Sequence, residues 1–175
     1  MAKRITLRPI GWVRNGWKEW GPRWRQVVSE IVLDPEHAER LDGIEGFSHV
    51  QVLFYLDRVS LGERRMERFH PMDREDLPVV GAFATRSQRR PNPIGLTAVR
   101  LLGREGNILR VKGLDALDGT PVLDIKPYSP RHDLIPEARV PAWVEELERM
   151  LDTDEQGPPP AARRRGGQGK EKDSR

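Results

Sequence analysis

The chain has 175 residues, 37% of them apolar, which is enough for one globular domain with a core of its own. Its 30 basic and 27 acidic side chains leave a formal net charge of +3, so net charge alone gives no reason to expect nucleic-acid binding. Cysteine is absent, which excludes disulfides, thiolate nucleophiles and cysteine-bound metals.

The first half of the chain predicts three strands and one short helix. Apolar and polar residues alternate over a short run in 5–14, which is broken by a proline and a glycine, and this pattern favours an edge strand. The β-branched run 27–33 predicts a second strand. Asp34 and Pro35 are typical of a helix start, and that helix should end before Gly43. The run 50–59 predicts a buried, central strand.

The second half predicts a surface excursion over residues 60–77, with a short helix within 61–69, and then a strand at 79–85. Runs 96–102 and 108–111 flank a turn cluster and predict a β-hairpin, and a last strand begins at 122–125. Apolar spacing over 141–151 predicts an amphipathic helix. Many short strands joined by turns indicate a mostly β fold, a single antiparallel β-barrel-like domain with short peripheral helices.

The predicted domain covers residues 1–151, and we expect 152–175 to be a disordered charged tail, because three prolines and three arginines there accompany almost nothing that could be buried. No apolar run is long enough to span a membrane and no secretory leader opens the sequence. We therefore expect a cytoplasmic protein with no membrane partner.

Residues 83–95 form the most unusual segment, with Arg86, Arg89, Arg90 and Asn92 placed among two prolines. Proline fixes its own backbone and restricts the residue before it, so the segment should be a stiff loop. No acidic residue occurs between Asp76 and Glu105. This pattern indicates an anionic ligand.

The usual nucleotide-binding signatures are absent: the sequence has no G-x-G-x-x-G after a strand and no phosphate-binding loop of the G-x-x-x-x-G-K type. Its four histidines lie far apart and lack metal-ligand spacing, so we expect no metal. Any nucleotide-like cofactor must be held by an architecture other than a Rossmann fold.

Asp124, Lys126 and Tyr128 are spaced by two, so they share one face of a strand and form a plausible acid-base and hydrogen-bonding set. Asp118, before Gly119, fits turn chemistry better than catalysis.

Three other features leave alternatives open. Asp57 and Arg58 form either a solvated ion pair or part of a pocket at a strand end. His49 either contacts a ligand or, more commonly, binds a backbone carbonyl. The four tryptophans in residues 12–24 suit RNA stacking or, slightly better, a subunit interface.

Three motifs carry a family resemblance: Gly-Ala-Phe-Ala-Thr-Arg-Ser-Gln-Arg-Arg-Pro-Asn-Pro-Ile-Gly at 81–95, Gly-Phe-Ser-His at 46–49, and Leu-Asp-Gly-Thr-Pro-Val-Leu-Asp-Ile-Lys-Pro-Tyr at 117–128. Together they closely resemble the TrmO/TsaA (YaeB-like) family. These tRNA methyltransferases use S-adenosylmethionine to methylate N6 of threonylcarbamoyladenosine at tRNA position 37. The resemblance implies a non-Rossmann β-barrel that works as a homodimer, with the cofactor near the subunit interface.

By position, the resemblance places cofactor contacts at one set of residues. These are Asp57, Arg58, Arg86, Leu96, Lys112, Gly113, Leu114 and Asp115. The segment 21–26 departs from the Pro-Arg-Gln cofactor motif of longer members, which leaves contacts there in doubt.

For the reaction that the resemblance implies, our hypothesis is that Asp124, Lys126 and Tyr128 are the catalytic set, while Arg89, Arg90 and Asn92 bind the tRNA substrate through a phosphate or the threonyl carboxylate. Two alternatives remain: a non-catalytic RNA- or anion-binding module, and a methyltransferase that acts on a different small acceptor.

Overall fold

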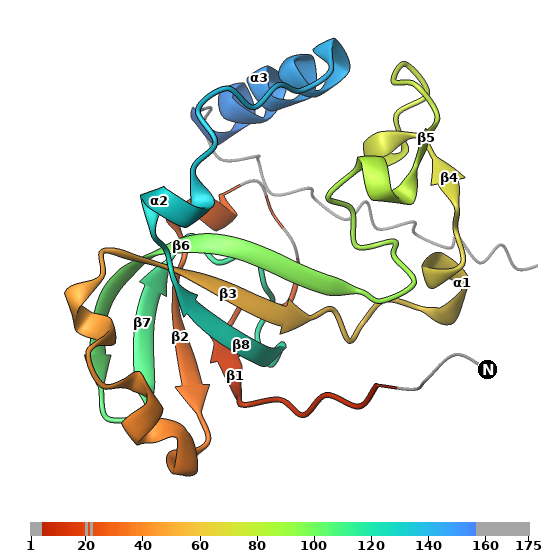
Figure 1. Ribbon diagram of the computed structural model, residues 1–175. Coiled ribbons are helices and arrows are strands. Elements are labelled where there is room, and N and C mark those ends of the chain that lie inside the picture. The colour runs from red at the N-terminus through yellow and green to blue at the C-terminus, as the bar shows by residue number, and fades with distance from the viewer. Residues whose placement is uncertain (1–4, 20, 22, 157–175) are drawn as a thin grey trace, which may run out of the picture.

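Antiparallel strands close into a barrel in the computed structural model, which describes residues 5–19, 21 and 23–156 (Figure 1). The strands of the barrel are β1 (Gly11–Arg14), β2 (Val28–Leu33), β3 (His49–Tyr55), β6 (Ile94–Glu105), β7 (Ile108–Lys112) and β8 (Pro121–Pro127). Their order is β1-β2-β7-β6-β3-β8, and β8 pairs with β1 to close the barrel. The predicted mostly β, antiparallel fold is confirmed.

The core fills the barrel because alternate side chains of each strand point inward. In β3, Val50, Val52 and Phe54 are at most 2% exposed, whereas Gln51 and Leu53 lie on the outer side and are half-buried. The same alternation buries residues from the other strands: Val13, Ile31, Leu33, Val99, Leu109, Val111 and Val122. The outer side of β3 therefore remains available for contacts with other molecules.

Local turn signals predicted the hairpin well. Strands β6 and β7 pair antiparallel as expected, although the turn is tighter than the cluster 103–107, with Gly106 at a φ of 57°. The strand predicted at 50–59 ends at Tyr55, and the chain bends there because the amide of Asp57 donates back to the carbonyl of Tyr55, 2.9 Å away. The strand predicted at 5–14 begins only at Gly11.

The strand predicted at 79–85 is largely wrong. Only β5 (Val80–Gly81) is extended and paired, with β4 (Arg68–Phe69), and a 3-10 turn follows at Ala82–Ala84. The Thr85 hydroxyl donates to the carbonyl of Ala82 over 3.0 Å and stabilises this turn. Apolar residues there therefore do not continue a barrel strand.

The helices differ from prediction in type and length. The segment predicted after Asp34 is a 3-10 helix at Pro35–Leu41, followed by another at Ile44–Gly46, and 3-10 turns also form at Trp24–Gln26 and Pro71–Asp73. The helix expected within 61–69 is α1 (Leu61–Arg64), capped by Ser60. Short helix α2 is Pro130–Asp133, and α3 (Ala142–Gln156) continues past the predicted end at residue 151. Residues 157–175 of the predicted tail lie outside the described residues.

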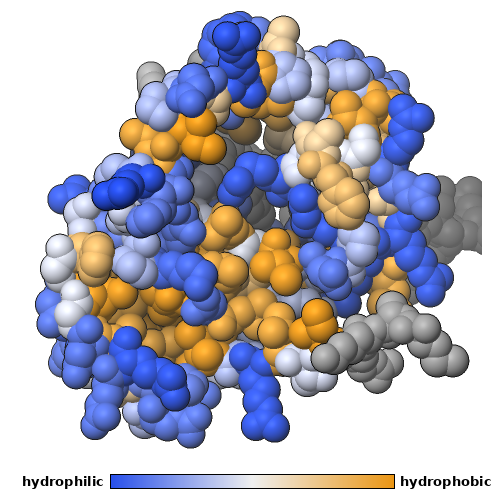
Figure 2. All heavy atoms as spheres, in the orientation of Figure 1, coloured by the Kyte–Doolittle hydropathy of each residue, from blue (hydrophilic) through white to orange (hydrophobic). Residues whose placement is uncertain are grey.

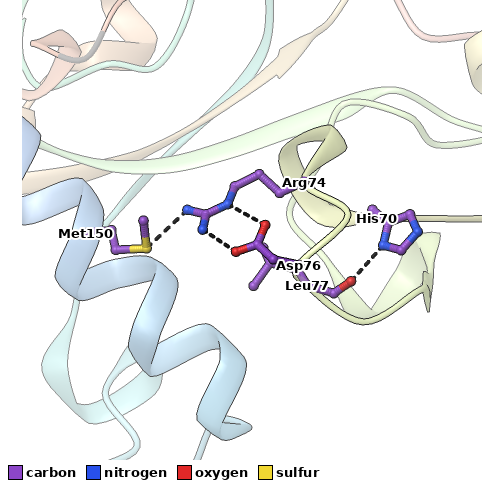
Figure 3. A network of polar contacts seen from close by, with 5 residues as sticks. All are labelled: His70, Arg74, Asp76, Leu77 and Met150. Atoms are coloured by element: carbon purple, nitrogen blue, oxygen red, sulfur yellow. Dashed lines mark hydrogen bonds and ion pairs between the residues drawn. The ribbon is translucent and has the colours of Figure 1, made fainter.

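Residues 60–93, which we call the lobe, leave the barrel between β3 and β6 and stand beside it (Figure 1). Arg74 connects the lobe to α3 (Figure 3): its Nε donates to Asp76 over 3.0 Å, and its Nη1 lies 3.1 Å from the sulfur of Met150. The hydrogen bond with Asp76 raises the pKa of Arg74 above its ordinary value. Arg25 adds a second link to α3 through Asp152.

Asp118 anchors the segment that crosses from β7 to β8. Its Oδ1 accepts the backbone amides of Asn15 at 2.8 Å and Gly16 at 3.0 Å, which fixes the turn after β1. These two hydrogen bonds lower the pKa of the Asp118 carboxyl below its usual value. The interpretation of Asp118 as a structural turn residue agrees with this geometry.

We expect Asp118→Asn to lower the free energy of unfolding by about 0.5–1 kcal/mol near neutral pH, because hydrogen bonds to a charged acceptor become neutral ones. The folded-state pKa lies below the unfolded one, so the stabilisation is present above the unfolded value and is lost as pH falls through the folded value. Urea unfolding at about pH 7 and about pH 3 measures this difference. A constant difference between the two proteins at both pH values would contradict the prediction.

Candidate active site

The outward side chains of β6, β3 and β8 form one surface, which we call the outer face. Strand register places Leu53 of β3 between Leu96 of β6 and Asp124 of β8. One step along the strands, Gln51 lies between Ala98 and Lys126. Because opposed residues point to the same side of a sheet, side chains from three strands converge here.

Two of the three predicted catalytic side chains form a direct pair on this face. The Lys126 ammonium lies 2.7 Å from the Asp124 carboxylate, and this hydrogen-bonded contact raises the pKa of Lys126. Asp124 also accepts the Ile125 backbone amide at 2.9 Å. Both side chains are about half exposed, so a substrate can reach them.

Tyr128 lies just past the end of β8, where its amide donates to the carbonyl of His49 over 3.0 Å. The two rings make an edge contact with centroids 6.4 Å apart. His49 is exposed, and its Nδ1 lies 2.9 Å from the Ser48 hydroxyl. Among the described residues, the His49 ring makes no hydrogen bond to a backbone carbonyl, which was the commoner of the two alternatives for this side chain.

Four of the predicted cofactor residues gather where β3 ends and β6 begins. The Arg86 guanidinium donates to the carbonyl of Leu96 over 2.6 Å. Asp57 and Arg58 lie just past the end of β3, directly after the Leu56–Pro93 hydrogen bond. The Arg86 side chain therefore extends from the lobe to β6, at the edge of the outer face.

Arg58 binds backbone carbonyls rather than Asp57. It donates to the carbonyl of Lys18 over 3.1 Å and to that of Asp118 over 2.8 Å. The solvated Asp57–Arg58 ion pair that we considered is not present among the described residues. Arg58 instead joins the turn after β1 to the crossing segment before β8.

The other four predicted cofactor residues, 112–115, differ in where their side chains lie. Lys112 is the last residue of β7, where it pairs with Arg100 of β6. Gly113 has a φ of 85° and bonds Val27, and Leu114 is 1% exposed within the core. The Leu114 side chain therefore packs the barrel, and only its backbone is placed to meet a ligand.

The arginines of the loop, predicted for substrate, are largely occupied by protein groups. Arg89 makes a two-pronged contact with Asp73, at 2.5 and 2.7 Å, and this hydrogen bonding lowers the pKa of Asp73. Arg90 donates to the carbonyls of Thr85 at 2.8 Å and Ser87 at 3.1 Å. Asn92 is exposed.

The sequence does not mark Asp73 as a partner of Arg89, because Asp73 lies outside the acid-free stretch 77–104 and only the folding of the lobe places it beside Arg89. The stiffness that the prolines predict is supplied in part by these contacts. Pro93 itself is fully buried.

Sequence reasoning also missed a cavity of about 230 Å³ beside Asp124. It lies beyond the last β1–β8 pair, Gly11 with Val122, where the two strands separate. The 3-10 helices Pro35–Leu41 and Ile44–Gly46, which follow β2, form its other wall. Its lining residues are Ile10, Leu33, His37, Arg40, Leu41, Ile44, Asp124 and Ile125. In the sequence, only His37, in the helix predicted after Asp34, could have indicated this cavity. A histidine in a short helix is too common to indicate a binding site.

The tryptophan-rich segment is only partly described. Trp12 is 47% exposed on β1, and Arg25 lies over the Trp24 ring at 5.2 Å, whereas Trp20 and Pro22 lie outside the described residues. In the described part of the chain, no group of histidine and acidic side chains could hold a metal ion. No described helix is both long and apolar enough to cross a bilayer.

Comparison with known proteins identifies relatives over most of the chain. The family model for the tRNA-methyltransferase O N-terminal domain matches residues 20–134. A probable S-adenosyl-L-methionine-binding protein of Archaeoglobus fulgidus is 43% identical, over 81% of this chain and 38% of the relative. A tRNA (adenine(37)-N6)-methyltransferase of Mus musculus is 41% identical, over 75% of this chain and 32% of the mouse protein.

A solved structure agrees with the sequence comparisons. TrmO from Pseudomonas aeruginosa is 35% identical and superposes with a TM-score of 0.66, over 81% of this chain and 62% of that one. The matched region spans less than two thirds of each of these three relatives. Because the matched residues 20–134 make up more than half of the sequence, the chain belongs to the tRNA-methyltransferase O family, as its motifs predicted.

Proposed function

We propose that the protein is an S-adenosylmethionine-dependent methyltransferase that methylates N6 of threonylcarbamoyladenosine at position 37 of tRNA. The family and the names of its relatives support this reaction class. The observation that carries the proposal is the outer face, where Leu53 alone separates Leu96 from Asp124. At the usual strand spacing, the cofactor edge and the catalytic carboxylate are about 10 Å apart.

The residues present fit S-adenosylmethionine. Arg86 offers a guanidinium for the carboxylate of the methionyl group, and Asp57 offers a carboxylate for its ammonium group. Leu96, 42% exposed, and half-buried Leu53 give an apolar surface for the adenine or the methylene groups. Asp115 and the backbone of Gly113 and Leu114 complete the proposed set with Arg58 and Lys112.

The cofactor supplies an activated methyl group, so the chain mainly has to position the acceptor and remove a proton. The acceptor N6 is a ureido nitrogen, which is weakly nucleophilic while it carries its proton. Asp124 accepts that proton, and Lys126 and Tyr128 bind the carbonyl oxygen of the carbamoyl group and so increase the acidity of N6. The Asp124–Lys126 contact keeps the carboxylate in place until the substrate arrives.

The lobe provides a surface that suits an anticodon loop. Phe83 is 79% exposed, and the Arg90 guanidinium lies 5.9 Å from its ring centroid. Arg64 and Arg65 line an adjoining cavity of about 590 Å³. Unpaired bases stack on such aromatic and arginine planes while cations contact phosphates. Asn92 faces the same substrate, and Arg89 reaches a phosphate only by leaving Asp73.

We also propose that the protein is a homodimer whose cofactor site lies near the subunit interface. Figure 2 shows apolar side chains gathered over β3 and β8. Ile94 and Leu96 of the outer face are 38% and 42% exposed, and an exposed apolar surface of this kind marks an interaction site. Because tRNA is the proposed substrate, we place the protein in the cytoplasm.

Two measurements test the proposal. Calorimetry should show S-adenosylmethionine binding, and mass spectrometry of position-37 nucleosides should show the methyl group only when a strain lacking the gene is complemented with it. Binding without methylation would favour a non-catalytic module of the same fold. Methylation of some other molecule would favour a different acceptor.

We expect Arg86→Ala to weaken S-adenosylmethionine binding about 10- to 100-fold, because a charged hydrogen bond to the ligand's carboxylate is lost. Calorimetry at fixed salt measures the change. Arg110→Ala, an exposed arginine on β7, is the matched control and should bind as the wild type does. Equal affinity in the two variants would remove Arg86 from the cofactor site.

A further inference from the structure

The cavity beside Asp124 has an apolar wall and a small number of polar groups. Ile10, Leu33 and Ile44 supply aliphatic surface from three separate segments. At ~30 Å³ for each water, its volume of about 230 Å³ holds roughly seven or eight water molecules. Sites for complete small-molecule ligands are usually larger, about 300–1,000 Å³. The cavity therefore suits a group the size of one amino acid.

His37 supplies a polar atom that needs a partner. Its Nδ1 is buried and makes no hydrogen bond with any described residue. Its Nε2 lies 3.7 Å from the exposed carboxylate of Glu36, which is farther than a hydrogen bond. Buried polar atoms are almost always satisfied, and an unsatisfied one indicates a water, an ion or a ligand at that position.

Arg40 and Asp124 give the cavity its charge. Within the described part of the chain, no hydrogen bond or ion pair engages the Arg40 guanidinium. Asp124 is the acid among the lining residues, and its charge is offset by Lys126 at 2.7 Å. An anionic group can therefore bind at Arg40 without facing an uncompensated carboxylate.

We propose that this cavity binds the threonyl group that the substrate carries on N6, an inference that rests on the proposed function. Across the sheet the order is Arg86 and Leu96, then Leu53, then Asp124, then the cavity. An acceptor nitrogen beside Asp124 has the methyl donor on one side and the cavity on the other. The substituent of that nitrogen then points into the cavity.

Each part of the threonyl group has a complementary partner. Arg40 binds the carboxylate through its planar donors. The Nδ1 of His37 exchanges a hydrogen bond with the threonyl hydroxyl. Ile10 and Ile44 pack against the methyl group. The cavity thus recognises the features that distinguish threonine from glycine, and it determines which modified tRNA is accepted.

The test compares kcat/KM for tRNA that carries threonine on the carbamoyl group with kcat/KM for the same tRNA that carries glycine. We expect the wild type to prefer threonine at least about 10-fold, since a methyl and a hydrogen-bonded hydroxyl are both recognised. Ile44→Trp fills the cavity and His37→Leu removes the polar atom, and each should reduce the preference to about 2-fold or less. Arg40→Gln should raise KM for both tRNAs, and Arg110→Gln should behave as the wild type does.

Unchanged preference in both His37→Leu and Ile44→Trp would overturn the inference while leaving the proposed function intact, and the cavity would then hold only water. A direct binding measurement separates the two hypotheses. Addition of threonylcarbamoyladenosine nucleoside to ¹⁵N-histidine-labelled protein should shift the His37 resonances, and Arg40→Gln should weaken this titration about 10-fold. Wild-type protein that transfers no methyl group contradicts the proposed function, and the titration then decides whether the cavity is a threonyl site.

Discussion

Asp124→Asn is expected to reduce kcat for methyl transfer to threonylcarbamoyladenosine-containing tRNA by about 10²- to 10⁴-fold, the range for loss of a positioned general base. Asparagine keeps the shape of the side chain and can still accept the Ile125 amide hydrogen bond. It cannot take the N6 proton, and it no longer balances the charge of Lys126. The fold should be unchanged because the side chain is about half exposed.

Single-turnover methyl transfer with saturating cofactor measures this effect without product release. Lys126→Gln breaks the same ion pair but leaves the carboxylate, so it should reduce the rate less than Asp124→Asn does. Glu30→Gln removes an exposed, arginine-paired carboxylate elsewhere on the barrel and serves as the matched control. A rate for Asp124→Asn within twofold of the wild type would remove Asp124 from the mechanism.

The parts of the fold that could be predicted from sequence are those set by local chemistry. Turn residues around Gly106 fix the β6–β7 hairpin, and period-two spacing places Asp124 and Lys126 on one face. The segment 79–85 has similar apolar content, yet it forms a 3-10 turn, because its partner is the two-residue strand β4 and not a barrel strand. Local propensity does not reveal how long a pairing partner is.

The candidate site combines contacts between residues close in sequence with contacts that depend on tertiary packing. Asp124 and Lys126 are two residues apart, so their alignment could be predicted, whereas Asp73 and Arg89 are 16 residues apart and meet only because the lobe folds back on itself. The cavity beside Asp124 arises where β8 separates from β1, and its lining comes from residue 10, residues 33–44 and residues 124–125. No motif marks such a feature, because it depends on tertiary packing.

Gly95 explains a part of the Pro-Asn-Pro-Ile-Gly motif that ligand binding alone does not. It pairs directly with Phe54 across β6 and β3, and the Phe54 ring covers it. A Cβ atom at Gly95 would lie 2.3, 2.4 and 2.8 Å from three ring carbons. Phe54 is 2% exposed in the core, so its ring can move only by displacing other core side chains.

Gly95→Ala should therefore lower the free energy of unfolding by about 1–3 kcal/mol, the usual effect of overpacking a core. It should also weaken S-adenosylmethionine binding, because the next carbonyl, that of Leu96, accepts the Arg86 hydrogen bond. Urea unfolding measures the first effect and calorimetry the second.

Gly103→Ala is a matched control on the same strand, because a Cβ there has no described atom within 4 Å and should change stability by no more than about 0.5 kcal/mol. Phe54→Leu combined with Gly95→Ala should recover part of the loss, because the smaller side chain relieves the contact. A double-mutant cycle then gives a coupling energy of about 1 kcal/mol or more. Equal destabilisation by Gly95→Ala and Gly103→Ala, or strict additivity with Phe54→Leu, would show that the ring contact does not explain the glycine. If coupling is found, Gly95 stabilises the barrel and holds the carbonyl of Leu96 where Arg86 binds it, so one residue of the motif contributes to both the fold and the proposed cofactor site.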